Sequence, residues 1–217
     1  MQKHELETVK GVIKEGEKEG VTDLGLSELG FLYLHTIFIQ RGRLETTWSV
    51  LRRFGYGDDL SLKEDFLYPH LEVAPECSVE LSSDGYQFLT DVFQSFDKDK
   101  DGALKDSELE ELFSTSPANP WESTGFPETT VSNESGAVTL QGFLAQWSMT
   151  TLLDFKITLA YLAYLGYPLE DTTTALKVTK PKKVDRRRGG KIQRNVFLCY
   201  VLGAAGCGKV NCCHKHV

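Results

Sequence analysis

The sequence predicts a mainly α-helical protein assembled from helix–loop–helix pairs. Three observations support this prediction: apolar residues recur at helical spacing, one acidic loop joins two such segments, and two motifs each occur twice along the chain. Helices are expected over residues 5–19, 27–41, 45–54, 85–96 and 140–150, with another beginning at Ser107.

The composition excludes several classes of protein. The 217 residues are 41% hydrophobic and 25% charged, so the chain can bury a core and is neither disordered nor collagen-like. No apolar run reaches the roughly 18 residues of a membrane-spanning helix, and the most apolar run covers only residues 158–167. The N-terminus lacks the apolar stretch of a secretory signal, and the cysteines form no even framework. We therefore expect a reducing, cytosol-facing environment.

The net charge of -7 hides a strong asymmetry along the chain. Residues 177–194 hold nine Lys and Arg against one Asp, a balance of +8. Residues 1–176 hold 13 basic against 30 acidic residues, a balance of -17. An acidic body disfavours nucleic acid and suits a cation or a basic partner. The basic stretch is interpreted as a solvated linker.

Two amphipathic helices flank the acidic loop. The first, over residues 85–96, has an apolar stripe at three- and four-residue intervals: Tyr86, Leu89, Val92, Phe93 and Phe96. Ser82 or Ser83 is expected to cap it. The second is expected to begin at Ser107, where Glu110 would complete a capping box.

Residues 97–108 match the twelve-residue EF-hand calcium loop at every defining position. The expected ligands are the side chains at positions 1, 3, 5 and 12 and the backbone carbonyl at position 7: Asp97, Asp99, Asp101, Glu108 and Ala103. Gly102 supplies the sharp turn at position 6. Lys105, at position 9, offers no oxygen, so we expect water at that vertex. Calcium is a hard ion that prefers such oxygen ligands.

Two other interpretations compete with a calcium-binding EF-hand. One is a solvated acidic turn between helices, and the other is a dockerin-type calcium loop. Amphipathic helices on both sides and the complete positional match favour the EF-hand. Dockerin loops come in close pairs, and no second acidic loop occurs in this sequence.

EF-hands usually work in pairs, which predicts a partner loop. Residues 136–139 lie between two expected helices but lack alternating carboxylates, so a ligand-free hand is expected near residues 132–150. Val138 is expected to pair with Leu104 as a short strand, and Thr139 to cap the next helix.

An internal repeat extends this arrangement. Residues 26–32 and 138–144 share an apolar residue, Ser or Thr, two residues and Gly-Phe-Leu, at an offset of 112. Residues 51–56 and 162–167 share a similar Gly-Tyr motif at an offset of 111. We interpret this as a duplicated helical unit, and we expect the calcium hand of the first copy to lie before Met1.

The carboxyl end carries a second candidate site. Residues 195–202 are expected to form a buried strand that leads into the glycine-rich pattern GxxxxGK at 203–209. Three residues would bind a nucleotide phosphate: Gly203, Gly208 and Lys209. Val210 stands where Ser or Thr would hold magnesium, and few residues follow. The site is therefore expected to be an inactive remnant in this chain, and no catalytic residue is assigned.

Taken together, these motifs resemble the mitochondrial Rho GTPases, the Miro family. The resemblance rests on five stretches: residues 31–60, 97–113, 119–121, 140–147 and 194–209. It implies four segments: a remnant of a first EF-hand unit (1–60), a second EF-hand unit (61–175), a basic linker (176–194) and the truncated start of a C-terminal GTPase domain (195–217).

The resemblance also implies a function. Members are anchored in the mitochondrial outer membrane facing the cytosol, hydrolyse GTP with Mg²⁺, bind Ca²⁺ and link mitochondria to motor-adaptor proteins for transport, distribution and morphology. Carried onto this sequence, the calcium ligands are those of residues 97–108, while the GTPase domain contributes only Gly203, Gly208 and Lys209. We expect the isolated chain to be cytosolic, without its own membrane anchor or GTPase activity. The alternative is a stand-alone EF-hand calcium sensor or buffer with no mitochondrial role.

Overall fold

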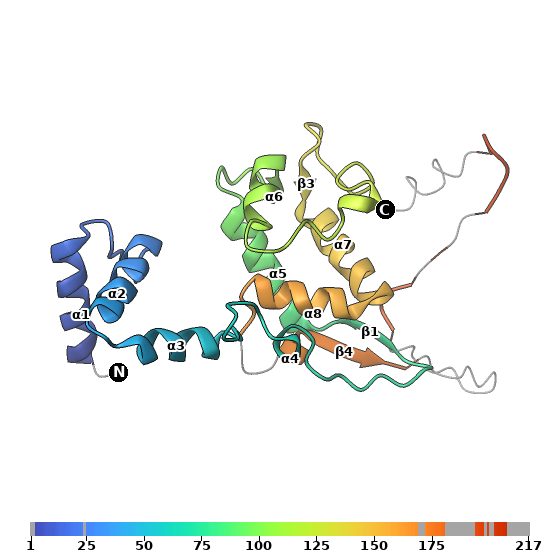
Figure 1. Ribbon diagram of the computed structural model, residues 1–217. Coiled ribbons are helices and arrows are strands. Elements are labelled where there is room, and N and C mark those ends of the chain that lie inside the picture. Colours follow the sequence, from blue (N-terminus) through green and yellow to red (C-terminus); the bar gives the residue numbers. More distant parts are fainter. Residues whose placement is uncertain are drawn as a thin grey trace. The chain divides into compact units, whose positions relative to one another are not determined.

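The computed structural model describes residues 3–23, 25–168, 172–180, 194–197, 199 and 202–207. The chain divides into two units, residues 1–63 and residues 64–217, and each is described by itself. The structure is mainly helical, which confirms the predicted fold class (Figure 1). Among the described residues, we find no helix with both the length and the apolar character needed to cross a membrane.

The described part of the first unit is helical and lightly packed. It consists of α1 (Lys3–Gly16), α2 (Glu28–Gln40) and α3 (Leu44–Arg53), close to the predicted ranges. Helix α2 contacts both α1 and α3. Ile13 of α1 is fully buried, whereas several apolar side chains of α2 remain half exposed, such as Leu32.

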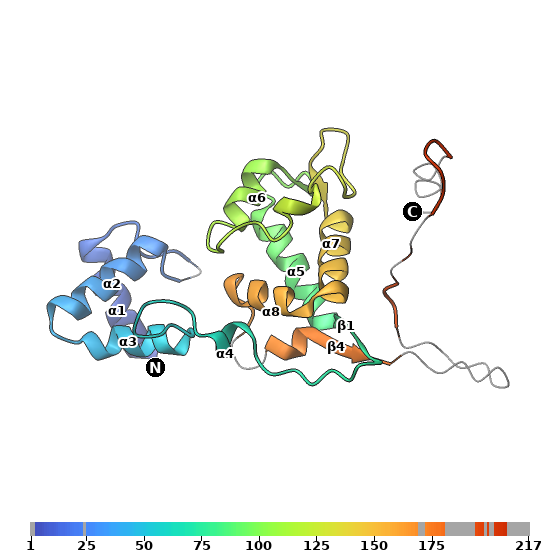
Figure 2. The same cartoon turned by 45° about the vertical axis from the view of Figure 1, so that its right-hand side comes forward.

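The second unit is built from helices and two short antiparallel ribbons. Its helices are α4 (Glu64–Leu67), α5 (Ser83–Phe96), α6 (Asp106–Leu112), α7 (Leu140–Leu153) and α8 (Phe155–Tyr164). Its strands are β1 (Ser78–Leu81), β2 (Ala103–Leu104), β3 (Val138–Thr139) and β4 (Leu176–Thr179), and β1 pairs with β4 and β2 with β3. Helix α7 packs against α5 and α8, and the β1–β4 ribbon lies at one end of this group (Figures 1 and 2).

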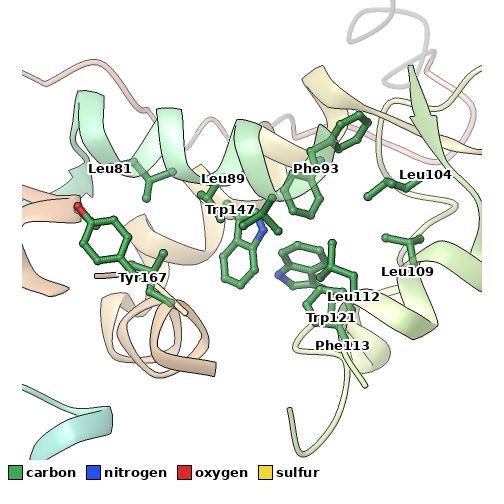
Figure 3. Close-up of a cluster of buried hydrophobic side chains, with 14 of the residues drawn as sticks. Leu81, Leu89, Phe93, Leu104, Leu109, Leu112, Phe113, Trp121, Trp147 and Tyr167 are labelled. Carbon is green, nitrogen blue, oxygen red and sulfur yellow. The ribbon is translucent and has the colours of Figure 1, made fainter. Parts of the chain in front are cut away.

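Aromatic side chains and leucines together form the core of the second unit (Figure 3). The rings of Trp121 and Trp147 have centroids 4.8 Å apart, and both side chains are buried. Trp121 Nε1 donates a hydrogen bond to Thr150 Oγ1 at 2.8 Å, which satisfies its polar edge. Phe93 of α5 faces Phe143 of α7 at 5.5 Å. Each such side chain stabilises the fold by roughly 1.5–3 kcal/mol on burial.

Three helices begin with the same arrangement of a capping hydroxyl and a glycine. The caps are Ser27, Ser82 and Thr139, and the glycines three residues later are Gly30, Gly85 and Gly142. Each glycine N–H donates to the capping hydroxyl at 3.2 Å. Each cap also donates its own backbone N–H to a carbonyl of another segment. A Cβ on the glycine would lie only 1.9 to 2.3 Å from that same carbonyl oxygen.

The helix after the acidic loop begins one residue earlier than predicted. It starts at Asp106, with Lys105 at the N-cap, so the capping box proposed for Ser107 and Glu110 is wrong. The reason is that Glu108, rather than Glu110, reaches back, accepting the Lys105 backbone N–H at 3.0 Å.

Four of the described α-helices and strands were not predicted: α4, α8, β1 and β4. Helix α8 overlaps the apolar run at residues 158–167, and it packs on α7 with Leu159 and Leu162 buried. Strand β4 occupies residues 176–179, which had been assigned to the linker, and pairs with β1 in the register Leu81 opposite Leu176.

The strand predicted over residues 195–202 is not formed by its described residues. Residues 195–197 and 199 belong to no strand, and Phe197 is 61% exposed. A strand needs a neighbour for its backbone N–H groups. Here the N–H groups of Asn195 and Val196 instead donate to the side chain of Glu80.

Candidate calcium site

The acidic loop is held between α5 and α6 by a tight backbone turn. Helix α5 ends at Phe96, and Asp97 follows as its C-cap with its N–H donated to the Phe93 carbonyl at 2.9 Å. Gly102 has a φ of 83°, a left-handed conformation that glycine adopts without strain. The chain thereby reverses between the first and last acidic residues of the loop.

A two-residue ribbon ties this loop to its partner loop. Leu104 of β2 lies opposite Val138 of β3, and Ala103 lies opposite Thr139. Both Leu104 and Val138 are fully buried. The predicted strand pairing is confirmed, and so is Thr139 as the cap of α7.

Three predicted ligands converge on one point. Asp97, Asp99 and Glu108 each offer a carboxylate oxygen, and these oxygens lie within 4.8 Å of one another. Asp97 and Glu108 are 9% and 7% exposed. Neighbouring carboxylates with little access to water repel one another, and a cation between them relieves that repulsion.

Backbone N–H groups fix the orientation of the two buried carboxylates. The two oxygens of Asp97 accept N–H groups of the loop at 3.1 and 3.0 Å. The two oxygens of Glu108 accept one N–H each at 3.0 Å, from Lys98 and Lys105. Both carboxylates are therefore held in place by the fold, a condition for a preorganised ligand shell.

Lys105 places an ammonium group among the remaining acids. Its Nζ forms an ion pair with Asp99 and a second one with Asp101 at 3.6 Å. The hydrogen bond from Lys105 holds the pKa of Asp99 below its usual value, and the same bond raises the pKa of Lys105. The sequence indicated only that position 9 lacks an oxygen. The signal in the sequence that could have identified a competing cation is the lysine at position 9, within reach of the acids at positions 3 and 5.

The other two predicted ligands lie close by but are engaged differently. The Asp101 carboxylate accepts the backbone N–H of Ala103 at 2.9 Å. Ala103, whose carbonyl is the predicted position-7 ligand, lies in β2. The structure therefore gathers three of the five predicted ligands into one group and places the other two on the same loop.

The partner loop contains an amide where a calcium loop would contain carboxylates. Asn133 Oδ1 accepts the backbone N–H groups of Ser135 at 3.0 Å and Ala137 at 2.9 Å. Gly136, with a φ of 86°, makes the turn. Across the described parts of the chain, no second group of three metal-ligating side chains is found.

Two of the three predicted phosphate-binding residues lie outside the described residues. Gly203 is described, exposed and outside any helix or strand. Gly208 and Lys209 are beyond the described part, so their role in binding phosphate stays a prediction.

Comparison with known proteins supports the interpretation of the chain as an EF-hand region. Two family models described as "EF hand associated" match residues 1–85 and residues 121–190, on either side of the acidic loop. Mitochondrial Rho GTPase 1 of Cryptococcus neoformans is 65% identical over 86% of this chain and 28% of its own length. The proteins of the same name from Mycosarcoma maydis and Neurospora crassa are 56% and 49% identical, over 85% and 96% of this chain.

The chain spans only about a third of the length of these relatives, with 30% of the Mycosarcoma maydis protein and 34% of the Neurospora crassa protein covered. The similarity to these three relatives covers between 85% and 96% of the chain. Helical pairs, the loop geometry and the sequence identity agree. The chain belongs to the mitochondrial Rho GTPase family, within which it corresponds to the EF-hand region and the start of a GTPase domain.

Proposed function

We propose that residues 97–108 bind one Ca²⁺ ion and that this is the calcium-responsive element of a mitochondrial Rho GTPase. The observation that carries the proposal is the convergence of Asp97, Asp99 and Glu108 in a loop of EF-hand spacing. The donors are oxygens, which suits a hard cation. The ligand-free partner loop supports the site through the β2–β3 ribbon.

The chain's own residues suggest how binding would act. Asp97, Asp99, Asp101 and Glu108 would supply carboxylate oxygens, and Ala103 its carbonyl. Calcium would neutralise the repulsion among these acids. Asp97 caps the end of α5, and Glu108 lies in the first turn of α6, so one ion would join the two helices.

Calorimetric titration with Ca²⁺ tests this proposal. The wild-type chain is expected to bind one equivalent, and Glu108→Gln is expected to lose at least tenfold in affinity because it removes the bidentate ligand. Glu111→Gln is the matched control, since Glu111 lies on the same helix and pairs with Lys98 outside the ligand set. No heat of binding at millimolar Ca²⁺, or equal binding in both variants, would contradict the proposal.

The relatives' name suggests where this element works. We infer that the chain belongs to a protein of the mitochondrial outer membrane, facing the cytosol, that as a whole binds GTP and Mg²⁺. In this chain Gly203, Gly208 and Lys209 would contact the phosphates of GTP, whereas Val210 offers no ligand for Mg²⁺. Motor-adaptor proteins are the proposed partners, and transport and distribution of mitochondria the proposed role. In cells, Glu108→Gln in the whole protein should change mitochondrial movement in response to calcium without changing its location. If mitochondria in cells with that variant responded fully to calcium, a stand-alone calcium sensor or buffer would be a better hypothesis than the calcium-responsive element of a mitochondrial GTPase.

A further inference from the structure

Glu80 is a buried carboxylate that the calcium loop does not use. It lies on β1 between Val79 and Leu81, both of which belong to the hydrophobic core. Because side chains alternate along a strand, Glu80 points to the opposite face of the ribbon. It is nevertheless only 1% exposed. Something must therefore cover that face.

A segment distant in sequence contacts this carboxylate. Glu80 Oε1 accepts the backbone N–H of Asn195 at 2.8 Å and that of Val196 at 3.1 Å. The other oxygen, Oε2, forms an ion pair with Lys177 Nζ at 3.5 Å, from the residue directly opposite in the β1–β4 register. Oε2 makes no conventional hydrogen bond.

Two features indicate that this contact is specific: the free-energy cost of burying the Glu80 carboxylate, and the connection that it makes between β1 and residues 195 and 196. Burial of a carboxylate is unfavourable unless hydrogen-bond donors compensate it. An apolar residue at this position of β1 would stabilise the short ribbon more. Two consecutive N–H groups aimed at one oxygen supply such compensation. The segment that donates them leads to the glycine-rich stretch at 203–209.

The strand that carries Glu80 leads directly into the first helix of the calcium-binding hand. Strand β1 ends at Leu81, and the next residue, Ser82, caps α5. Helix α5 then runs without interruption to Asp97. We propose that Glu80 is the docking residue by which the EF-hand unit holds the segment that enters the GTPase domain. This inference rests on the family assignment and is independent of calcium binding.

Amide hydrogen exchange at Asn195 and Val196 tests the dock directly. In the full 217-residue chain, Glu80→Ala should accelerate exchange of both amides by about tenfold or more, since it removes a charged acceptor. Glu80→Gln keeps the shape but loses the charge, and an intermediate acceleration is expected. Glu76→Ala removes an exposed acid just before β1 and should leave both amides unchanged. Unchanged exchange in a Glu80→Ala chain with native near-ultraviolet circular dichroism would overturn the proposal.

A second variant covers the case in which Glu80→Ala does not fold. Val196→Pro removes one of the two donors from the segment itself and leaves the β1–β4 ribbon intact. It should accelerate exchange at Asn195 while the near-ultraviolet spectrum, to which the buried Trp121 and Trp147 contribute, stays native. Unchanged exchange at Asn195 in Val196→Pro would overturn the proposal equally.

Discussion

Lys105 is a cation within a loop suited to bind a cation. Its ammonium contacts Asp99 and Asp101, two of the predicted calcium ligands. Calcium must therefore displace a tethered competitor before these acids can coordinate it. All of these groups are partly exposed, so the competition is weakened by solvent screening and is expected to tune the affinity rather than to abolish binding.

Replacement of this lysine should tighten calcium binding. Lys105→Gln is expected to raise the affinity about two- to fivefold, because it frees Asp99 and offers an amide oxygen at position 9. Lys100→Gln removes the same charge from the same loop and is the control for long-range electrostatics. Calorimetry that gives equal affinities for the two variants would show that Lys105 acts only through net charge.

His35 makes the stability of the first unit depend on pH. Its Nδ1 lies 3.0 Å from Thr47 Oγ1, and burial lowers its pKa from 6.5. The unfolded chain then binds a proton more readily than the folded one. The free energy of unfolding therefore has its full value above pH 6.5, and it decreases as the pH falls from 6.5 through the lower pKa of the folded state. An NMR titration of the His35 ring should give a midpoint below 6.5. A midpoint that urea leaves unchanged would contradict this account.

At the level of single residues, the calcium loop was the most predictable feature. Its ligands follow from spacing within twelve consecutive residues, so their convergence needs no long-range information. Glu80 was not predictable in the same way. Its alternation with Val79 and Leu81 indicates an outward-facing side chain, and only the folded chain shows that residues 195 and 196 cover it.

Among the elements, the starts of α2, α5 and α7 explain why the internal repeat is so short. Each start needs a hydroxyl to cap the helix and a glycine three residues later, because a carbonyl of another segment occupies the space of a Cβ. The repeat therefore preserves Ser27 with Gly30 and Thr139 with Gly142, whereas the two residues between each cap and its glycine differ. The same requirement applies to Ser82 and Gly85, which the repeat did not reveal.

This geometry predicts unequal effects for two glycine substitutions in the first unit. Gly30→Ala should destabilise it by about 1–3 kcal/mol, because the new Cβ would lie 1.9 Å from the Gly20 carbonyl oxygen. Gly11→Ala, on α1 with no atom within 4 Å of the added Cβ, should stabilise it by up to about 1 kcal/mol. Exchange protection of α1 and α2 amides measures both. Equal effects would rule out the close backbone approach.

Helices α3 and α5 have a clear apolar stripe and were predicted. Helices α2 and α7 were predicted although their apolar residues are spread around the helix, whereas α8 and the short elements were not predicted. The ranges of α2, α3, α5 and α7 agree with prediction within a few residues. Helix α8 is apolar on most sides, which hides its periodicity. Strands β1 and β4 are four residues each and distant in sequence, so their pairing depends on the packing of α5, α7 and α8.

At the level of the whole molecule, the core and the calcium loop belong to one unit. Residues 64–217 contain the loop, its ligand-free partner and the aromatic core. Phe93 of α5 lies one turn before Asp97, so the loop is attached to the core by the last turn of a helix. Ion binding should therefore be transmitted to the stability of this unit.

Calcium is expected to stabilise the second unit selectively. At a calcium concentration 100 times the dissociation constant, the free energy of unfolding should rise by about 2.7 kcal/mol. Denaturation followed by the fluorescence of Trp121 and Trp147 in a Trp48→Phe background measures this. Glu108→Gln is the control, and with an affinity at least tenfold weaker it should gain about 1.4 kcal/mol or less at the same calcium concentration. Exchange protection in residues 3–23 should not change. An equal gain in wild type and Glu108→Gln would place the bound ion elsewhere.

The most direct test of calcium binding is an NMR titration that locates the ion. With ¹⁵N-labelled protein, the amide signals of residues 97–108 should shift first and saturate at one equivalent of Ca²⁺, and Gly102 and the β2 residues Ala103 and Leu104 should be among them. Smaller changes should follow in β3. Signals of the loop that stay in place at millimolar calcium, or shifts confined to other acidic segments, would contradict the account.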